Sequence, residues 1–349
     1  MTYRKLSQVG EIALLEKIKK RFGKKSRTVL CGIGDDASVL KPFNKCLLLT
    51  TDMMVEGVHF DLAFTTPFQL GFKLVSVNVS DIYAMGGRPS HVLLNIAVQK
   101  DTGSEFVDLF FQGIQEAMDR YHTSLVGGDL SASPKDMSLS ATLVGHADRY
   151  LQRSGAKVGD RIYVTGTTGD SACGLQLLKK INRQVPLSRK SGRLNSIPSA
   201  LRTRLVRIGL SWDVAEPLVR RHLMPEARNP GQFVRDATSM IDISDGLLID
   251  LTRLCKESGT GAKLYEEKIP LSPEMEKAAR QLGLSPLSLA LAGGEDYELL
   301  FTAPPGKKVN AIYIGDIIKS KMVMVDRKGR EKIFSARGYQ HFQGRNKRQ

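Results

Sequence analysis

One recurring arrangement constrains the fold of this chain more than any other sequence feature. Aspartates stand in short segments that contain glycine or serine and that we predict to be turns, and the residues just before or after them are apolar and β-forming. This pattern predicts strands with carboxylates at their ends. The set comprises Asp35 and Asp36 in GIGDDA, Asp52 in TTDMMVEG, Asp81 in NVSDIYAMGG, Asp129 in VGGDLS, Asp242 and Asp245 in DISDG, and Asp296 in GGEDYELL.

A single aspartate in a surface turn is commonplace, because its short side chain bonds to the local backbone. Several carboxylates that converge would repel one another unless cations neutralised them. Hard divalent ions with oxygen ligands suit this task, and Mg²⁺ held by carboxylates and phosphate oxygens is the usual nucleotide arrangement. The set as a whole therefore indicates Mg²⁺-dependent nucleotide chemistry.

Glycines in the same segments would let backbone amides approach anionic oxygens closely. They are Gly32, Gly34, Gly127, Gly128, Gly293 and Gly294. The segment GIGDDA also fits a loose dinucleotide fingerprint, but two acids where a pyrophosphate would pack argue against it. The sequence contains neither a Walker A loop nor the protein-kinase motifs, so an ATP enzyme of this kind would use another cradle.

The periodicity of the first half predicts a mixed α+β unit. Residues 28–60 indicate two strands, and apolar positions at helical spacing over 68–85 predict a helix that stops at Gly86. A strand (HVLLNIAVQ) follows, then an amphipathic helix over 104–121 and two further strands. The chain begins with an amphipathic helix rather than a secretory segment.

A polar, glycine-containing seam over 148–160 divides the chain into two predicted domains, 1–148 and 149–349. The second domain repeats a strand, a glycine turn and a helix, as in DRIYVTGTTGD and in DISDGLLIDL. The basic run 181–212 has weak periodicity, and we interpret it as an insertion.

Composition adds limits on the function. The formal charge is +15, and residues 171–212 hold nine Lys or Arg and no acid. Such an excess indicates either a solvated surface or a polyanionic partner. No apolar run is long enough for a membrane span, and the four cysteines lack paired spacing. We therefore expect reduced thiols and a cytoplasmic protein, with no nucleic-acid module and no membrane segment.

The motifs, in their order, resemble those of thiamine-monophosphate kinases, within the superfamily of aminoimidazole ribonucleotide synthetase. The matching segments run from about residue 30 to 342 and are GIGDDA, TTDMMVEGVHF, NVSDIYAMGG, GGD, RSGAKVGD, VTGTTGDSACGL, DISDGL and GGEDYELLFT. The resemblance implies an α+β protein of two α/β-type domains. The N-terminal domains would pair in a homodimer through a shared β-barrel, and ATP and several Mg²⁺ ions would lie in a cleft.

The resemblance also assigns roles to individual residues by motif position. It implies Mg²⁺ ligands at Asp36, Thr50, Thr51, Asp52, Asp81, Asp129, Asp242 and Asp245. It implies ATP contacts at Gly128, Asp129, Arg153 and Ser244, and thiamine-monophosphate contacts at His59, Glu295 and Tyr339. The alternatives are a packing role for Tyr339, a surface turn for Glu295, a core or loop histidine at His59 and a linker charge at Arg153.

The implied reaction is direct in-line transfer of the γ-phosphoryl group of ATP to thiamine monophosphate. The acceptor phosphate has a second pKa of about 6 and is already anionic, so no general base is needed. Two alternatives remain at this stage. One is a relative in the same superfamily that acts on a formyl-amidine, selenide or carbamoyl group. The other is a basic nucleic-acid-binding protein using residues 179–207 and the C-terminal tail, which would show steep salt dependence and no ATP turnover.

Overall fold

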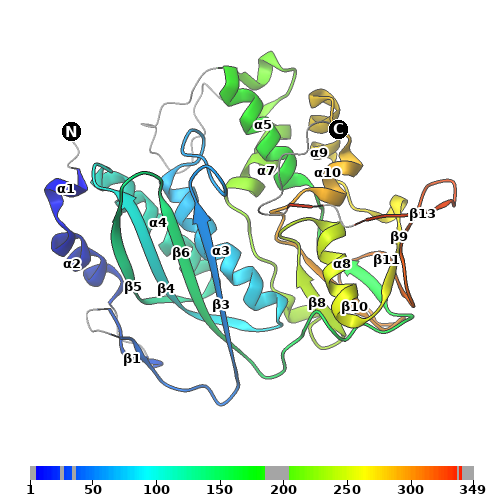
Figure 1. Ribbon diagram of the computed structural model, residues 1–349, viewed down its shortest axis with the longest axis horizontal. Helices are drawn as coiled ribbons and strands as arrows, with labels where there is room; N and C mark the ends of the chain where they lie inside the picture. Colours follow the sequence, from blue (N-terminus) through cyan, green and yellow to red (C-terminus); the bar gives the residue numbers. More distant parts are fainter. Residues whose placement is uncertain (1–4, 24–26, 34–36, 185–203, 336–337, 340–349) are drawn as a thin grey trace. The chain divides into compact units, whose positions relative to one another are not determined.

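The computed structural model describes residues 5–23, 27–33, 37–184, 204–335 and 338–339. Two compact units are found, one within Met1–Tyr150 and one that begins at Leu151. Each unit has its own sheet, covering helices and buried apolar core (Figure 1). Both combine helices with sheets that are mostly antiparallel, so the predicted α+β class is confirmed.

The first unit contains a main sheet, a small strand pair and two long helices. Its helices are α1 (Leu6–Val9), α2 (Glu11–Phe22), α3 (Pro67–Ala84) and α4 (Ser104–Tyr121). Its strands are β1 (Val29–Cys31), β2 (Val39–Leu40), β3 (Cys46–Val55), β4 (Arg88–Gln99), β5 (Ser124–Ser133) and β6 (Ser138–Ala147).

The main sheet of this unit is open, with the order β3-β6-β4-β5. Strands β3 and β4 both run antiparallel to β6, whereas β5 runs parallel to β4. Helices α3 and α4 pack against each other on one face of the sheet (Figure 1). Within the described residues the four strands do not close into a barrel.

Helix α3 has an apolar sequence because it is enclosed by the sheet and by α4. It begins with a capping box, in which Thr66 Oγ1 accepts the Gln69 N–H at 3.3 Å and Gln69 Oε1 accepts the Thr66 N–H at 2.9 Å. Glycines allow the close approach of α4: a Cβ on Gly71 would lie 2.1 Å from the Phe110 oxygen. The helices predicted over 68–85 and 104–121 are both confirmed.

The second unit contains one large sheet and several helices. Its α-helices are α5 (Asp170–Gln184), α7 (Trp212–Leu223), α8 (Leu247–Ser258), α9 (Pro273–Leu282) and α10 (Pro286–Ala292), with short 3₁₀ turns at Pro230–Gln232 and Glu266–Lys268. Its strands are β7 (Arg161–Val164), β8 (Ser239–Asp242), β9 (Gly261–Tyr265), β10 (Leu299–Ala303), β11 (Ile312–Ile318), β12 (Met322–Val325) and β13 (Glu331–Ile333).

The seven strands follow the order β13-β12-β9-β11-β7-β10-β8, and every neighbouring pair is antiparallel except β9 and β12. Strand β8 leads through the DISDG loop into α8, and β7 leads through a glycine turn into α5, as the sequence predicted. No helix in the described part of the chain is both long and apolar enough to cross a bilayer.

Candidate functional site

The first unit gathers oxygen atoms where α3 passes β3. Thr50 Oγ1 donates a hydrogen bond to Asp81 Oδ2 at 2.6 Å. One turn earlier on α3, Asn78 Oδ1 accepts the N–H of Asp52 at 3.0 Å. Because residues three apart share a helix face, Asn78 and Asp81 point at the same stretch of β3. The structure therefore brings Thr50, Asp52 and Asp81 together.

The two other described ligand candidates of this unit lie on the opposite face of the sheet. Thr51 Oγ1 donates to the Ala141 oxygen at 3.0 Å. The register across β6 and β4 aligns Met53 with Asp129, and aligned residues share a face. Since Met53 directly follows Asp52, and successive strand residues alternate, Asp52 and Asp129 point to opposite faces.

The VGGDLS segment lies within β5 and is not the turn that its glycines suggested. Gly128 has a φ of 147°, and a Cβ there would lie 1.9 Å from the Leu94 oxygen of the adjacent strand. Glycine is thus needed for close strand approach, which explains why the turn prediction for Asp129 was wrong.

His59 lies in the tight turn after β3 and is half-buried. Its Nδ1 accepts the Val55 N–H at 3.0 Å, which fixes the orientation of the ring. In the neutral imidazole the proton therefore sits on Nε2. This geometry defines which edge of His59 faces away from its own turn.

The oxygen donors that the first unit brings together are of the type that a hard cation prefers, but they are few. Thr50, Asp52 and Asp81 offer hydroxyl and carboxylate oxygens, which Mg²⁺ prefers. The prediction for Asp36 falls on residues 34–36, outside the described residues. Over the described chain, histidine, cysteine and carboxylate side chains form no group of three that could hold a metal.

In the second unit, the DISDG loop joins β8 to α8. Asp242 is the last residue of β8 and is only 4% exposed. Arg253 Nη1 donates to Asp245 Oδ2 at 2.6 Å and to Asp250 Oδ1 at 2.7 Å. Asp250 also accepts the N–H groups of Asp245 and Gly246, and burial raises its pKa to about 6. This buried carboxylate holds the loop at the start of α8.

The GGEDYE turn lies against that loop. The Glu295 N–H donates to the Ser244 oxygen at 2.7 Å, and the Tyr297 N–H donates to the Ile243 oxygen at 2.9 Å. Glu295 and Tyr297 have φ values of 64° and 52°, which are uncommon for residues other than glycine. At Gly294 a Cβ would lie 2.6 Å from the Ser244 oxygen, so the contact requires glycine.

The C-terminal residues reach the same loop. The Tyr339 N–H donates to the Asp245 oxygen at 3.0 Å, and a Cβ on Gly338 would lie 2.7 Å from that oxygen. Tyr339 is 47% exposed. Main-chain contacts thus bring Ser244, Asp245 and Glu295 to one place, with Tyr339 beside them.

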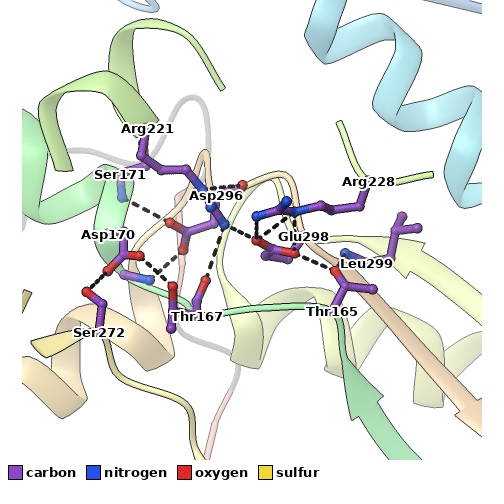
Figure 2. Close-up of polar contacts among 11 residues, drawn as sticks. Thr165, Thr167, Asp170, Ser171, Arg221, Arg228, Ser272, Asp296, Glu298 and Leu299 are labelled. Atoms are coloured by element: carbon purple, nitrogen blue, oxygen red, sulfur yellow. Dashed lines mark hydrogen bonds and ion pairs between the residues drawn. The ribbon is translucent and has the colours of Figure 1, made fainter. Parts of the chain in front are cut away.

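A buried polar network supports the GGEDYE turn (Figure 2). Glu298 has no exposed side-chain surface. Arg228 donates to both of its oxygens, from Nε to Oε2 at 2.9 Å and from Nη2 to Oε1 at 2.8 Å. Arg221 and Thr165 donate to Glu298 as well. Two guanidinium groups thereby offset the cost of burying this carboxylate.

Asp296 anchors the turn to the start of α5 (Figure 2). Its carboxylate accepts the N–H groups of Gly169 at 2.5 Å and Ser171 at 3.0 Å, and Arg221 Nε donates to its main-chain oxygen at 3.0 Å. Burial raises the pKa of Asp296 to about 7, although Arg221 and both N–H donors act in the opposite direction. The contacts give Asp296 a structural role, unlike its neighbour Glu295.

Arg153 lies at the other end of α8 from the DISDG loop. Its main-chain oxygen accepts a hydrogen bond from Ser258 Oγ at 2.9 Å, and Ser258 is the last residue of α8. Asp245 and Gly246 precede the first residue of that helix. The described contacts therefore do not bring Arg153 to Ser244.

Residues on α7 contribute to the site, although sequence reasoning assigned them no role. Arg221 contacts Glu298, and His222 Nδ1 lies 3.2 Å from Glu295 Oε2. The signal was present in the helix pattern, because His222 occupies the same face as the buried Leu218 and Val219. A histidine at a core-facing position indicates a buried polar partner.

The first unit matches a known protein family. A family model described as "AIR synthase related protein, N-terminal domain" matches residues 34–147. A curated thiamine-monophosphate kinase of Aquifex aeolicus (strain VF5) is 35% identical over 343 residues, which cover 97% of this chain and 100% of that protein.

Solved structures extend the similarity to the whole fold. A structure of "AaThiL complexed with AMPPCP and TMP" is 33% identical with a TM-score of 0.71, covering 98% of this chain and 100% of that one. A thiamine-monophosphate kinase from Stenotrophomonas maltophilia K279a is 30% identical with a TM-score of 0.74, covering 90% and 96%. Both units of the fold therefore have counterparts in solved structures.

Proposed function

Because this chain belongs to the thiamine-monophosphate kinase family, we propose that it transfers the γ-phosphoryl group of ATP to thiamine monophosphate, giving thiamine diphosphate and ADP. The observation that carries the proposal is the convergence of Ser244, Glu295 and Tyr339 through main-chain contacts in the second unit. Full-length similarity to a structure with AMPPCP and TMP bound supports the same two ligands.

The acceptor chemistry explains why no catalytic base is required. The phosphate of thiamine monophosphate, with a second pKa of about 6, is already a nucleophile at neutral pH. The barrier is the repulsion between two polyanions, so the task of the protein is to position them and to offset their charge. We therefore expect an in-line attack in which one phosphate oxygen of the acceptor forms the new P–O bond and ADP leaves.

Three residues are proposed to bind thiamine monophosphate. Glu295 supplies a partly exposed carboxylate for a cationic or amino-bearing ring. Tyr339, with nearly half of its surface exposed, supplies a face on which a heterocycle stacks. His59 supplies an imidazole ring whose orientation is fixed by the hydrogen bond from the Val55 N–H. The proposed ATP contacts are Gly128, Asp129, Arg153 and Ser244.

Mg²⁺ is the cofactor that the donor types fit. The residues proposed to hold the ions are Asp36, Thr50, Thr51, Asp52, Asp81, Asp129, Asp242 and Asp245. For Thr51 the main-chain oxygen is the proposed ligand, since its hydroxyl lies on the far face from Asp52. When bound, the ions would screen and orient the phosphates. Arg253 Nη1 lies 2.6 Å from Asp245 Oδ2, so this carboxylate already has a cationic partner within the protein.

We further propose a homodimer in which the sheets of two N-terminal domains (1–148) form a shared barrel, with 149–349 as the second domain. The support is an exposed apolar surface on β3, where Leu47, Leu49 and Met53 are 56%, 65% and 60% exposed. A second copy would remove these side chains from water. Sedimentation of the wild type and of Leu49→Lys tests this, and a monomeric wild type would contradict it.

The activity is tested by incubating the purified protein with ATP, Mg²⁺ and a panel of acceptors, and identifying products by mass. The panel contains thiamine monophosphate, thiamine, selenide and a formyl-amidine. We expect ADP and thiamine diphosphate with thiamine monophosphate and no product with the others. Phosphorylation of another acceptor in preference to thiamine monophosphate would contradict the proposal.

A further inference from the structure

Helices α5 and α7 touch backbone to backbone at one point. A Cβ on Gly174 of α5 would lie 2.1 Å from the Leu218 oxygen of α7, so a larger residue would force the helices apart. Ser171 lies one turn before Gly174, and His222 lies one turn after Leu218. Because residues three or four apart share a helix face, this contact also fixes the second pair. Ser171 Oγ and His222 Nδ1 are 3.1 Å apart.

The same nitrogen of His222 also lies next to the carboxylate of Glu295. His222 Nδ1 is 3.2 Å from Glu295 Oε2. The histidine side chain is 5% exposed, whereas that of Glu295 is 28% exposed. An ionised carboxylate only accepts hydrogen bonds, so the Nδ1–H group is the donor in this pair. A buried donor, fixed by helix packing, thus holds a carboxylate that reaches solvent.

Glu295 needs such a partner because its backbone alone does not set the direction of its carboxylate. The main chain is fixed in the left-handed region by the bond to Ser244. The side chain still has rotatable bonds, and ordering it during ligand binding would weaken affinity. A donor already in place removes that cost before the ligand arrives.

We propose that His222 is a positioning residue, which orients Glu295 for the organic part of the acceptor, a cationic heterocycle bearing an amino group. The inference rests on the proposed function and deepens it, since His222 acts on substrate selectivity and not on phosphoryl transfer. The role of His222 depends on the single hydrogen atom on Nδ1. A variant that keeps a hydrogen-bond donor at that place should therefore keep the affinity for thiamine monophosphate.

Two substitutions separate the donor from the volume of the side chain. In His222→Asn the amide nitrogen takes the place of Nδ1, whereas His222→Leu fills the space without a donor. We expect His222→Leu to raise KM for thiamine monophosphate about tenfold and to leave KM for ATP within about twofold, since a hydrogen bond to a charged group is lost. KM of His222→Asn for thiamine monophosphate should stay within about threefold of that of the wild type.

Arg220→Ala is the matched control, because Arg220 precedes His222 on α7 and its side chain is 56% exposed. It should change neither KM. If His222 only fills space, the order of the two variants would reverse, and the smaller Asn would raise KM for thiamine monophosphate more than Leu does. That order, or equal losses for both ligands, would overturn the proposal.

A second measurement does not depend on kinase activity. The Nδ1–H proton of His222 should appear in ¹⁵N-correlated spectra of the unliganded protein as a slowly exchanging signal, and Glu295→Ala should shift or remove it. Its absence from the wild type, or its indifference to Glu295→Ala, would overturn the contact. If this proton is present but thiamine monophosphate is not phosphorylated, the contact stands and the proposed function fails.

Discussion

The two units hold their functional residues by different means. In the second unit, Ser244, Glu295 and Tyr339 are brought together by main-chain hydrogen bonds, and a buried polar network holds the GGEDYE turn (Figure 2). In the first unit, Thr50 and Asp81 share one hydrogen bond, while Asp129 points to the other face of an open sheet.

The difference indicates two kinds of preorganisation. Buried charges with a full set of partners hold a site in one arrangement without a ligand. In the first unit, Asp81 accepts a hydrogen bond from the uncharged Thr50, and cations would relieve the repulsion between carboxylates that share a face of the sheet. We therefore expect the second unit to be rigid before ligands bind, and the first to depend on its ions.

The largest expected effect is that of Glu298→Ala on the stability of the second unit. This substitution leaves the guanidinium groups of Arg221 and Arg228 without their shared carboxylate. The expected loss is roughly 3–5 kcal/mol of unfolding free energy, the usual cost of breaking a buried pair. Urea unfolding measures it.

Glu226→Ala is the control, because Glu226 pairs with Arg220 at an exposed position, with 40% of its side chain exposed. It should cost no more than about 1 kcal/mol. Equal, small losses in the two variants would show that the network does not hold the second unit.

In the first unit the effect should fall on turnover and not on stability. Asp52→Asn and Asp129→Asn each remove one charge proposed to hold Mg²⁺, so kcat should drop roughly a hundredfold or more. Melting temperatures should stay near that of the wild type, since Asp129 is exposed. Asp136→Asn, in the connection between β5 and β6 and 55% exposed, serves as the control.

Because Asp52 and Asp129 lie on opposite faces, the pair also tests the metal assignment itself. Turnover near that of the wild type in either variant would remove that residue from the proposed ligands. Loss in both, with raised Mg²⁺ requirements, would show that both faces contribute.

The next effect concerns pH and the second unit. An aspartate has a pKa of 3.8 in the unfolded reference, and burial raises that of Asp296 to about 7. The folded protein therefore binds a proton that the unfolded chain has released between these values, so stability falls as pH rises through this window. The free energy of unfolding is expected to decrease by roughly 2 kcal/mol between about pH 5 and about pH 7.

Unfolding of the wild type and of Asp296→Asn across this range isolates the effect from other titrating groups. The variant will have a lower baseline, because its amide cannot accept both N–H bonds that the carboxylate accepts. Its slope against pH should be flatter. Parallel slopes would mean that Asp296 stays ionised in the folded state.

The smallest predicted effect is that of Tyr339→Ala. Loss of an aromatic face should raise KM for thiamine monophosphate roughly fivefold, since such contacts are worth about 1 kcal/mol. KM for ATP should not change. An unaltered KM for thiamine monophosphate would show that the substrate ring lies elsewhere.

Much of the fold follows from local sequence signals. The helix over 104–121 was predicted at its full length because its apolar positions recur at helical spacing. The DISDG loop between β8 and α8 was likewise visible, since glycine and aspartate mark such turns. Asp129 was misplaced because its two glycines signal a turn, and the need for a close strand neighbour is not written locally.

The support beneath the site could not be predicted in the same way. Arg221 and Glu298 are 77 positions apart, and each alone is an ordinary charged residue. Only the packing of α7 against the turn before β10 makes them partners. Charge pairs of this kind depend on tertiary contacts, which a single sequence does not reveal.

The central claim is that the phosphate of thiamine monophosphate is the nucleophile that forms the new P–O bond, and an isotope experiment tests it most directly. Thiamine monophosphate labelled with ¹⁸O in its three non-bridging oxygens is incubated with the protein, Mg²⁺ and unlabelled ATP, and the product is weighed by mass spectrometry. We predict thiamine diphosphate that retains all of the label. Thiamine diphosphate without the label, or no thiamine diphosphate at all, would contradict the account.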